Sequence, residues 1–273
     1  MTNILFFGTP EFVTPICDAL WDMTGSVPVN LVGVVTTPDK PVGRKQILTP
    51  SPIKQWALEK NIPVFTISHY PFPIIQPDLG ILAAYGQIIP QEIINLFPKG
   101  ILVIHPSLLP KYRGASPIQS AILNGDKKTG CSIIKMDAKM DHGPIVYQFE
   151  EEIKPEDTSM DLYNRIFVKT AEILKIVIPD YLEDKIILRE QNHDEATYCK
   201  ILTKNDGYFE YDNPPDKETL NRMIRAYSPW PSVWTMFQEK RIKFLPNNMV
   251  QLEGKNPVGI EQFKEANPAF KLF

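Results

Sequence analysis

The stretch Ile101-Leu102-Val103-Ile104-His105-Pro106-Ser107 decides the fold, because an apolar run rich in β-branched residues ends there at a histidine and a proline turn. Three similar apolar runs precede it, at 3–7, 31–35 and 79–84, and helical spacing lies between successive runs. Buried strands that alternate with helices are typical of a parallel sheet covered on both faces. The sequence therefore predicts an α/β protein with a doubly wound, mostly parallel sheet. Ligands of such sheets bind at the carboxyl ends of the strands, where His105 falls.

Two further strands are predicted after the parallel ones, at 132–136 and 145–149, on either side of a turn that contains Asp141. A long amphipathic helix should follow over 160–182, because its apolar residues recur at helical spacing. The periodic pattern weakens after Lys185.

The chain accordingly divides into three predicted parts. Residues 1–185 form the first domain, 186–207 a linker, and 208–273 a small β-rich C-terminal domain. A helix at 217–226 and short strands after a Pro-Trp-Pro turn are expected in this last part.

Composition narrows the class of protein. The 273 residues carry a net charge of -3 and are 43% hydrophobic, which predicts a soluble globular protein without a global nucleic-acid signature. Cys17, Cys131 and Cys199 are scattered without metal-ligand spacing, so we expect reduced structural cysteines and no metal site. No apolar run approaches the length of about 18 residues that a membrane span needs. These features together predict a cytoplasmic protein.

His105 and Asp141 are the candidate acid–base pair. An imidazole exchanges protons near neutral pH, and a carboxylate beside it orients the ring and stabilises the imidazolium. Each residue also has an ordinary interpretation, since a histidine in a proline-flanked turn is often structural and an aspartate near glycine is common turn chemistry. Spacing alone does not show that the two side chains meet.

Motifs along most of the chain resemble those of the folate-dependent formyltransferases. The core motif runs over 105–114 and continues over 136–143. Three other motifs are similar to the branch of that family that acts on methionyl-tRNA: Gly8-Thr9-Pro10-Glu11-Phe12, Pro38-Asp39-Lys40-Pro41-Val42-Gly43-Arg44 and Pro229-Trp230-Pro231. The resemblance implies a Rossmann-like formyltransferase domain over 1–185 and a barrel-like C-terminal domain over 208–273.

The same resemblance implies an activity. A formyl group would pass from 10-formyltetrahydrofolate, the co-substrate, to the α-amine of initiator methionyl-tRNA in translation initiation. His105 would be the acid–base group and Asp141 its electrostatic partner. The enzyme would be a monomer without a metal.

Binding residues follow from the resemblance as well. The folate site would be formed by these residues: Tyr85, Gly86, Gln87, Ile88, Ile89, Pro90, Ser107, Leu108, Leu109, Pro110, Asp137 and Met140. Lys40, Arg44 and Lys45, in a loop rich in proline and glycine, would contact the tRNA. The ordinary interpretation of these three cations is a solvated surface loop.

Two features depart from the family pattern. Where the family has an asparagine two positions before the histidine, this chain has Val103, which cannot donate a hydrogen bond to a developing oxyanion. Loss of one such donor costs about 10² to 10³ in rate, so we expect impaired turnover. The C-terminal domain is also shorter than the family's barrel.

Two alternatives remain open at this point. A sugar N-formyltransferase shares the His-x-Ser-Leu-Leu-Pro core, but such enzymes generally lack the Pro-Asp-Lys-Pro loop and the Pro-Trp-Pro turn. A catalytically inactive homologue that binds folate or tRNA is favoured by Val103 alone.

Overall fold

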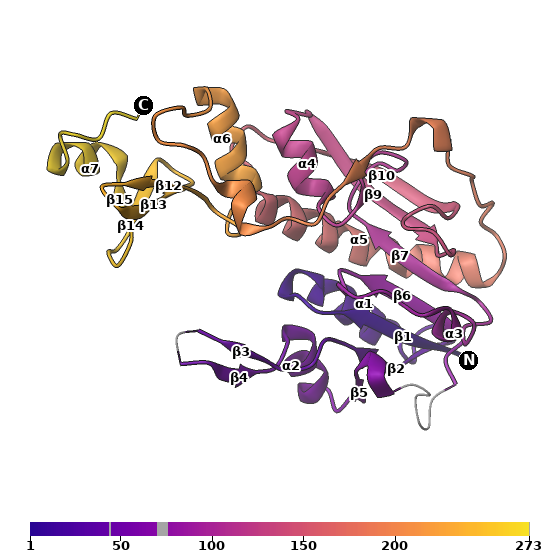
Figure 1. The fold of residues 1–273 in the computed structure, drawn as a ribbon. Coiled ribbons are helices and arrows are strands. Elements are labelled where there is room, and N and C mark those ends of the chain that lie inside the picture. The colour runs from indigo at the N-terminus through magenta and orange to yellow at the C-terminus, as the bar shows by residue number, and fades with distance from the viewer. Residues whose placement is uncertain (44, 70–75, 273) are drawn as a thin grey trace. The chain divides into compact units, whose positions relative to one another are not determined.

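The computed structural model describes residues 1–43, 45–69 and 76–272 (Figure 1). They divide into two compact units. The first unit comprises Met1–Arg113, Gly130–Glu151 and Asn164–Thr197. The second comprises Gly114–Thr129, Glu152–Tyr163 and the chain from Tyr198 onward. The chain therefore passes between the units more than once, and the predicted linker contributes residues to both.

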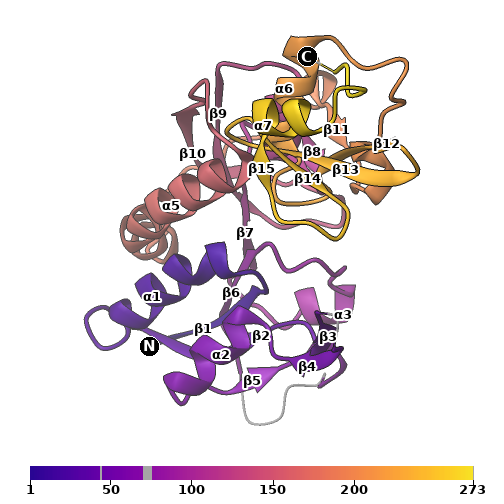
Figure 2. The same ribbon diagram turned by 90° about the vertical axis from the view of Figure 1, so that its left-hand side faces the viewer.

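A seven-stranded sheet forms the centre of the first unit, in the order β10-β9-β7-β6-β1-β2-β5 (Figure 2). Its strands are β1 (Thr2–Gly8), β2 (Val29–Val35), β5 (Val64–Phe65), β6 (Leu79–Ala83), β7 (Ile101–His105), β9 (Lys128–Lys135) and β10 (Ile145–Glu152). The five strands from β5 to β7 in this order pair in parallel, whereas β9 runs antiparallel to β7. The predicted doubly wound, mostly parallel sheet is confirmed.

The order of the strands indicates where a ligand would bind on the sheet. From β1 the chain moves outward through β2 and β5, then returns to β6 on the other side of β1 and continues to β7. The direction of winding thus reverses between β1 and β6. Ligands of open α/β sheets bind outside the carboxyl ends of the strands at such a reversal.

Burial explains why these segments are strands. Ile4, Leu5, Phe6 and Phe7 are at most 1% exposed, so β1 is covered on both faces. Strands buried on both faces have continuous apolar sequences instead of alternating ones. The predicted strands at 132–136 and 145–149 correspond to β9 and β10, which extend further toward 128 and 152.

The helices that follow the strands include α1 (Thr14–Met23), α2 (Pro52–Glu59), α3 (Gln91–Ile94) and the long α5 (Ser159–Leu182). Ser51 begins α2 by accepting a hydrogen bond from the backbone N–H of Lys54 at 3.1 Å, an N-cap that replaces a missing helical acceptor. The predicted helix at 160–182 coincides with α5 within one residue.

An exposed hairpin lies beyond α2 in the first unit, formed by β3 (Lys40–Val42) and β4 (Ile47–Thr49) (Figure 1). The Asp39 carboxylate pairs with Lys54 at 2.8 Å at its base. Its apolar residues are open to solvent, since Val42, Ile47 and Leu48 are 55%, 61% and 64% exposed.

The second unit contains an antiparallel sheet in the order β12-β13-β14-β15. Its elements are α4 (Pro117–Leu123), α6 (Lys217–Ala226), β12 (Val233–Phe237), β13 (Lys240–Leu245), β14 (Met249–Leu252), β15 (Val258–Gly259) and α7 (Ile260–Ala266). Phe237, Phe263 and Phe270 pack edge to face in its core, with ring centroids 5.1–6.2 Å apart. The predicted small β-rich C-terminal unit is confirmed. Within the described ranges, no helix has the length and apolar character of a membrane span.

Candidate active site

His105 ends β7 at the carboxyl edge of the sheet and is 5% exposed. Its Nε2 lies 2.8 Å from the carbonyl oxygen of Tyr112. A carbonyl can only accept, so Nε2 carries the proton and donates it to this bond. In the neutral ring, Nδ1 is then left with its lone pair.

Asp141 lies on the Nδ1 side of the ring. Its Oδ2 lies 3.5 Å from His105 Nδ1, and the Asp141 side chain is 14% exposed. Asp141 has a φ of 48°, a left-handed conformation that aspartate tolerates better than most residues. The structure thus brings together the two residues that the sequence predicted as an acid–base pair.

The turn of Asp141 is closely packed against β9. A Cβ on Gly143 would lie 1.9 Å from the Lys135 carbonyl oxygen, so only glycine fits there. His142 donates from Nδ1 to Asp137 Oδ2 at 2.6 Å, and Asp137 is one of the residues predicted for the folate site. Met140, also predicted for that site, is 64% exposed.

Two residues of the predicted linker that lie near the pair were not singled out in the sequence: Gln191 and His193. Gln191 donates to the carbonyl oxygens of Asp141 and Gly143 at 3.0 and 2.7 Å. His193 stacks on His142 with ring centroids 3.9 Å apart. A polar stretch gives no periodic signal, so only the tertiary contacts reveal these roles.

Val103 lies two residues before His105 and is 8% exposed. It belongs to an apolar cluster with Leu109, Ile134 and Ile145. The valine therefore packs well in its strand, and its side chain presents no donor near His105.

The residues predicted to form the floor of the folate site directly follow β7: Ser107, Leu108, Leu109 and Pro110. Ser132 Oγ accepts from the Leu109 N–H at 3.1 Å and donates to the Ser107 carbonyl at 2.7 Å. Gln148 Nε2 donates to the Leu109 carbonyl at 3.0 Å. These bonds hold the segment in place below the strand ends.

The other predicted folate loop, 85–90, follows β6 and is partly anchored in the core. Tyr85 and Ile89 are 1% and 9% exposed, and Tyr85 donates from its hydroxyl to Gln87 Oε1 at 3.0 Å. Burial raises the pKa of the Tyr85 hydroxyl. Between the two anchors, Ile88 is 88% exposed, and a Cβ on Gly86 would meet no atom within 4 Å. A ligand can therefore approach the backbone of this loop closely.

Two of the predicted tRNA contacts are described and one is not. Lys40 begins β3, and Lys45 lies in the turn of the hairpin; both side chains are exposed. Arg44 lies outside the described residues. Among the described residues, neither lysine has an ion-pair partner.

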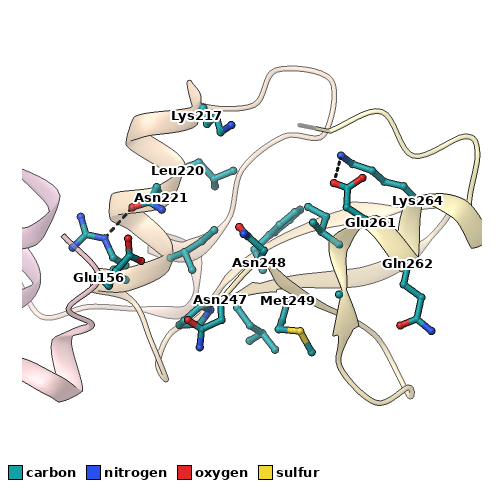
Figure 3. A pocket seen from close by; sticks show the side chains of 17 residues that line it. Glu156, Lys217, Leu220, Asn221, Asn247, Asn248, Met249, Glu261, Gln262 and Lys264 are labelled. Atoms are coloured by element: carbon teal, nitrogen blue, oxygen red, sulfur yellow. Dashed lines mark hydrogen bonds and ion pairs between the residues drawn. The ribbon is translucent and has the colours of Figure 1, made fainter.

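The second unit contains a cavity of about 560 Å³ between α6, the β13–β14 turn and α7 (Figure 3). Leu220, Phe244 and Ile260 line it with apolar surface. Amide side chains also line it, from Asn221, Asn247, Asn248 and Gln262. It contains none of the predicted folate residues.

A neighbouring cavity of about 570 Å³ shares Lys217, Asn221 and Arg225 with the first one. Its charged lining is mostly cationic: Lys127, Lys154, Lys217, Arg222 and Arg225 against Asp126 and Glu218. The second unit is therefore locally basic even though the chain is acidic overall. In the part of the chain that the structure describes, no group of three His, Cys, Asp or Glu side chains could hold a metal ion.

Two family models match the chain. The formyl transferase model matches residues 2–178, and the model of the formyl transferase C-terminal domain matches residues 201–268. The fold and the site thus define a formyl-group transferase.

Curated relatives make the assignment more specific. Methionyl-tRNA formyltransferase from Chloroflexus aggregans is 38% identical over 250 residues, which cover 89% of this chain and 79% of that protein. The enzyme of the same name from Pseudothermotoga lettingae is 40% identical over 244 residues, covering 88% and 78% of the two chains. The chain belongs to the formyltransferase family, in the group of the methionyl-tRNA formyltransferases.

Solved structures agree on the fold. Methionyl-tRNA formyltransferase from Clostridium thermocellum superposes with a TM-score of 0.63 at 20% identity, covering 95% of this chain and 100% of that one. A 4-N formyltransferase from Francisella tularensis gives 0.68 at 23% identity, with 87% and 93% covered. At these identities the likeness concerns the architecture alone.

Proposed function

We propose that this chain transfers the formyl group of 10-formyltetrahydrofolate to the α-amine of initiator methionyl-tRNA, as a monomer in the cytoplasm. The observation that carries the proposal is the His105–Asp141 pair, 3.5 Å apart at the strand ends of a formyltransferase fold. Two relatives named methionyl-tRNA formyltransferase, at 38% and 40% identity, support the choice of acceptor.

His105 acts as the base in this proposal. The folate supplies the formyl group. As the neutral amine forms its bond to the formyl carbon, the Nδ1 lone pair takes the proton that the amine releases. The Asp141 carboxylate stabilises the resulting imidazolium. The same proton then passes from Nδ1 to the folate nitrogen as its bond to the formyl carbon breaks, so the enzyme ends unchanged.

The folate would lie against the two loops at the strand ends. The open backbone at Gly86 and the exposed apolar side chains of Ile88 and Met140 suit a flat, largely apolar ring system. Ser107, Leu108, Leu109 and Pro110 would form the floor. Both carboxylate oxygens of Asp137 are engaged within the loop, Oδ1 by the Lys139 N–H at 2.9 Å and Oδ2 by His142 Nδ1 at 2.6 Å, so a ligand would use their remaining lone pairs.

The tRNA would be bound through phosphate contacts. Lys40 and Lys45 are exposed and have no ion-pair partner among the described residues, and Arg44 lies between them in the sequence. Cations without a partner release counterions when they meet phosphates, which makes the binding dependent on salt.

A second candidate function is a homologue that binds folate or tRNA without turnover. Val103 favours it, because the valine gives no donor to the charge that develops on the formyl oxygen. A sugar N-formyltransferase is less well supported, since the likeness to a solved enzyme of that name concerns the architecture at 20% identity.

The deciding experiment is a formylation assay with methionyl-tRNA and 10-formyltetrahydrofolate, with this chain and its Val103→Asn variant side by side. Formylated product from both chains supports the proposal. Binding of folate with no product from either chain would contradict it and favour a binding protein or another amine acceptor.

A further inference from the structure

A segment of the predicted linker, residues 189–197, lies against the candidate active site of the first unit; we call it the strap. At one end, the Arg189 backbone exchanges two hydrogen bonds with Ile145 at 2.8 and 2.9 Å. At the other end, the Thr197 carbonyl accepts from the Arg113 N–H at 2.8 Å, and its hydroxyl accepts from the Tyr112 N–H at 2.8 Å. The strap is thus fixed on both sides of the His105–Asp141 pair.

Gln191, the third residue of the strap, is 5% exposed. Its Nε2 donates to the Asp141 carbonyl at 3.0 Å and to the Gly143 carbonyl at 2.7 Å. Both protons of one amide nitrogen therefore hold the turn in which Asp141 adopts its left-handed φ of 48°. Without these bonds, two carbonyl groups of that turn would each lose a donor.

The other end of the Gln191 amide faces a buried cation. Oε1 accepts from Arg113 Nε at 3.2 Å and from Nη2 at 2.6 Å, and Arg113 is 2% exposed. Reversing the amide would place its oxygen against two carbonyl oxygens and its NH₂ against the guanidinium. The orientation of Gln191 is therefore unique.

Arg113 connects this amide to the histidine. It follows Tyr112, whose carbonyl accepts the Nε2 proton of His105 at 2.8 Å. One dipeptide thus holds the His105 ring directly and the turn of Asp141 through Gln191. Arg113 Nη2 also donates to His193 Nδ1 at 2.8 Å, and the His193 ring stacks on His142 in that same turn.

We propose that Gln191 is a positioning residue for formyl transfer: held by Arg113, it sets the distance between His105 Nδ1 and the Asp141 carboxylate without contacting a substrate. The expected effect of Gln191 on turnover rests on the proposed function, whereas its expected effect on the His105 ring does not. The residue acts on the acid–base pair, so the rate of the chemical step should respond and substrate binding should not.

The first test measures the kinetics of Gln191→Glu, with Glu190→Gln as its control. It also combines Gln191→Glu with Asp141→Asn in a double-mutant cycle. Gln191→Glu keeps the acceptors for Arg113 but removes both donors to the turn. Glu190 is exposed, and its side chain makes no hydrogen bond or ion pair within the described residues, so it serves as the matched control. We expect kcat to fall at least tenfold for Gln191→Glu, with both KM values within twofold, and Glu190→Gln to match the parent chain.

In the Asp141→Asn chain, Gln191→Glu should lower kcat by less than a further twofold. Gln191 acts by positioning the Asp141 carboxylate, and that carboxylate is already absent from this chain. Two outcomes would overturn the proposal. One is a raised KM at unchanged kcat in Gln191→Glu, and the other is a double variant whose reduction in kcat equals the product of the two single reductions.

The second test needs no turnover. NMR spectra of chains with ¹⁵N-labelled histidine show the signals of the two ring nitrogens of His105 directly. These signals should move in Gln191→Glu and stay in place in Glu190→Gln; unmoved signals in Gln191→Glu overturn the proposal. If Gln191→Glu does not fold, Gln191→Asn replaces it, since its shorter amide cannot reach both Arg113 and the turn. Moved signals in a chain that formylates no methionyl-tRNA would leave the positioning role intact and contradict the proposed function.

Discussion

Val103 and His105 lie two positions apart on β7, so their side chains point to the same face of the sheet. Both are buried, at 8% and 5% exposed. The position at which the proposed mechanism needs a hydrogen-bond donor is therefore occupied by an apolar side chain in an apolar cluster.

Val103→Asn should increase turnover at least tenfold, because an amide at this position adds a donor for the formyl oxygen, and such donors contribute about 10² to 10³ in rate. The same change should lower the free energy of unfolding by about 1–3 kcal/mol, since the amide is buried beside Leu109 and Ile134. Steady-state kinetics and thermal unfolding measure the two effects. Val103→Ile, which adds no donor, is the control; an equal gain in rate from it would refute the oxyanion explanation.

Asp141→Asn should reduce kcat by at least about 10², the lower end of what acid–base groups contribute, while leaving folate binding unchanged. The amide is neutral and cannot stabilise the imidazolium 3.5 Å away. Rates under saturating substrates and direct folate titration separate the two quantities. Turnover within twofold of the parent chain would mean that Asp141 only shapes its turn.

The sheet and the positions of His105 and Asp141 at its edge could be predicted from the sequence for physical reasons. Strands buried on both faces leave continuous apolar runs, and the end of such a run marks the ligand edge, which located His105. Asp141 required the family motif in addition, because turn chemistry alone explains an aspartate before His142-Gly143.

Gln191 could not be predicted in the same way. A single glutamine in a polar stretch has no period, and its function depends on Arg113 and Gly143, which lie far away in the sequence. For the same reason the predicted linker gave no sign that it contributes to the candidate site. The β3–β4 hairpin was expected only as a loop, because its strands bury no face and carry Pro41.

Lys40→Ala and Lys45→Ala should each raise the KM for tRNA and reduce the salt slope of binding by about 1, as expected for the loss of one phosphate contact. The KM for folate should not change. Lys60→Ala is the matched control, since Lys60 is an exposed lysine of the same unit outside the hairpin. Equal effects of all three substitutions would indicate general electrostatic attraction instead of a specific contact.

Glu151 should stabilise the fold in a pH-dependent way. Burial raises its pKa, but hydrogen bonds and charges from Arg165 at 2.7 Å and Lys169 at 3.1 Å outweigh burial and hold the pKa below its ordinary value of 4.5. A depressed pKa contributes stability that is complete above the unfolded pKa and is lost as pH falls through the folded one. Glu151→Gln should therefore cost about 1 kcal/mol at pH 7 and progressively less below about pH 4.5. Denaturant unfolding at pH 7 and below about pH 4.5 measures the loss of stability in Glu151→Gln. A loss that does not depend on pH would indicate that Glu151 contributes through packing alone.

Gly143→Ala should abolish turnover and destabilise the first unit, because the new methyl group would lie 1.9 Å from the Lys135 carbonyl oxygen. That oxygen belongs to β9 and cannot move without disturbing the sheet, so the turn that carries Asp141 must shift instead. We expect a loss of about 2–4 kcal/mol in the free energy of unfolding, as for other severe steric changes. Gly25→Ala is the matched control: Gly25 has a φ of 84° but nothing within 4 Å of a Cβ, so it reports backbone strain alone, at about 1 kcal/mol. Comparable losses of stability and rate from the two substitutions would show that the close approach to β9 does not hold Asp141 in place.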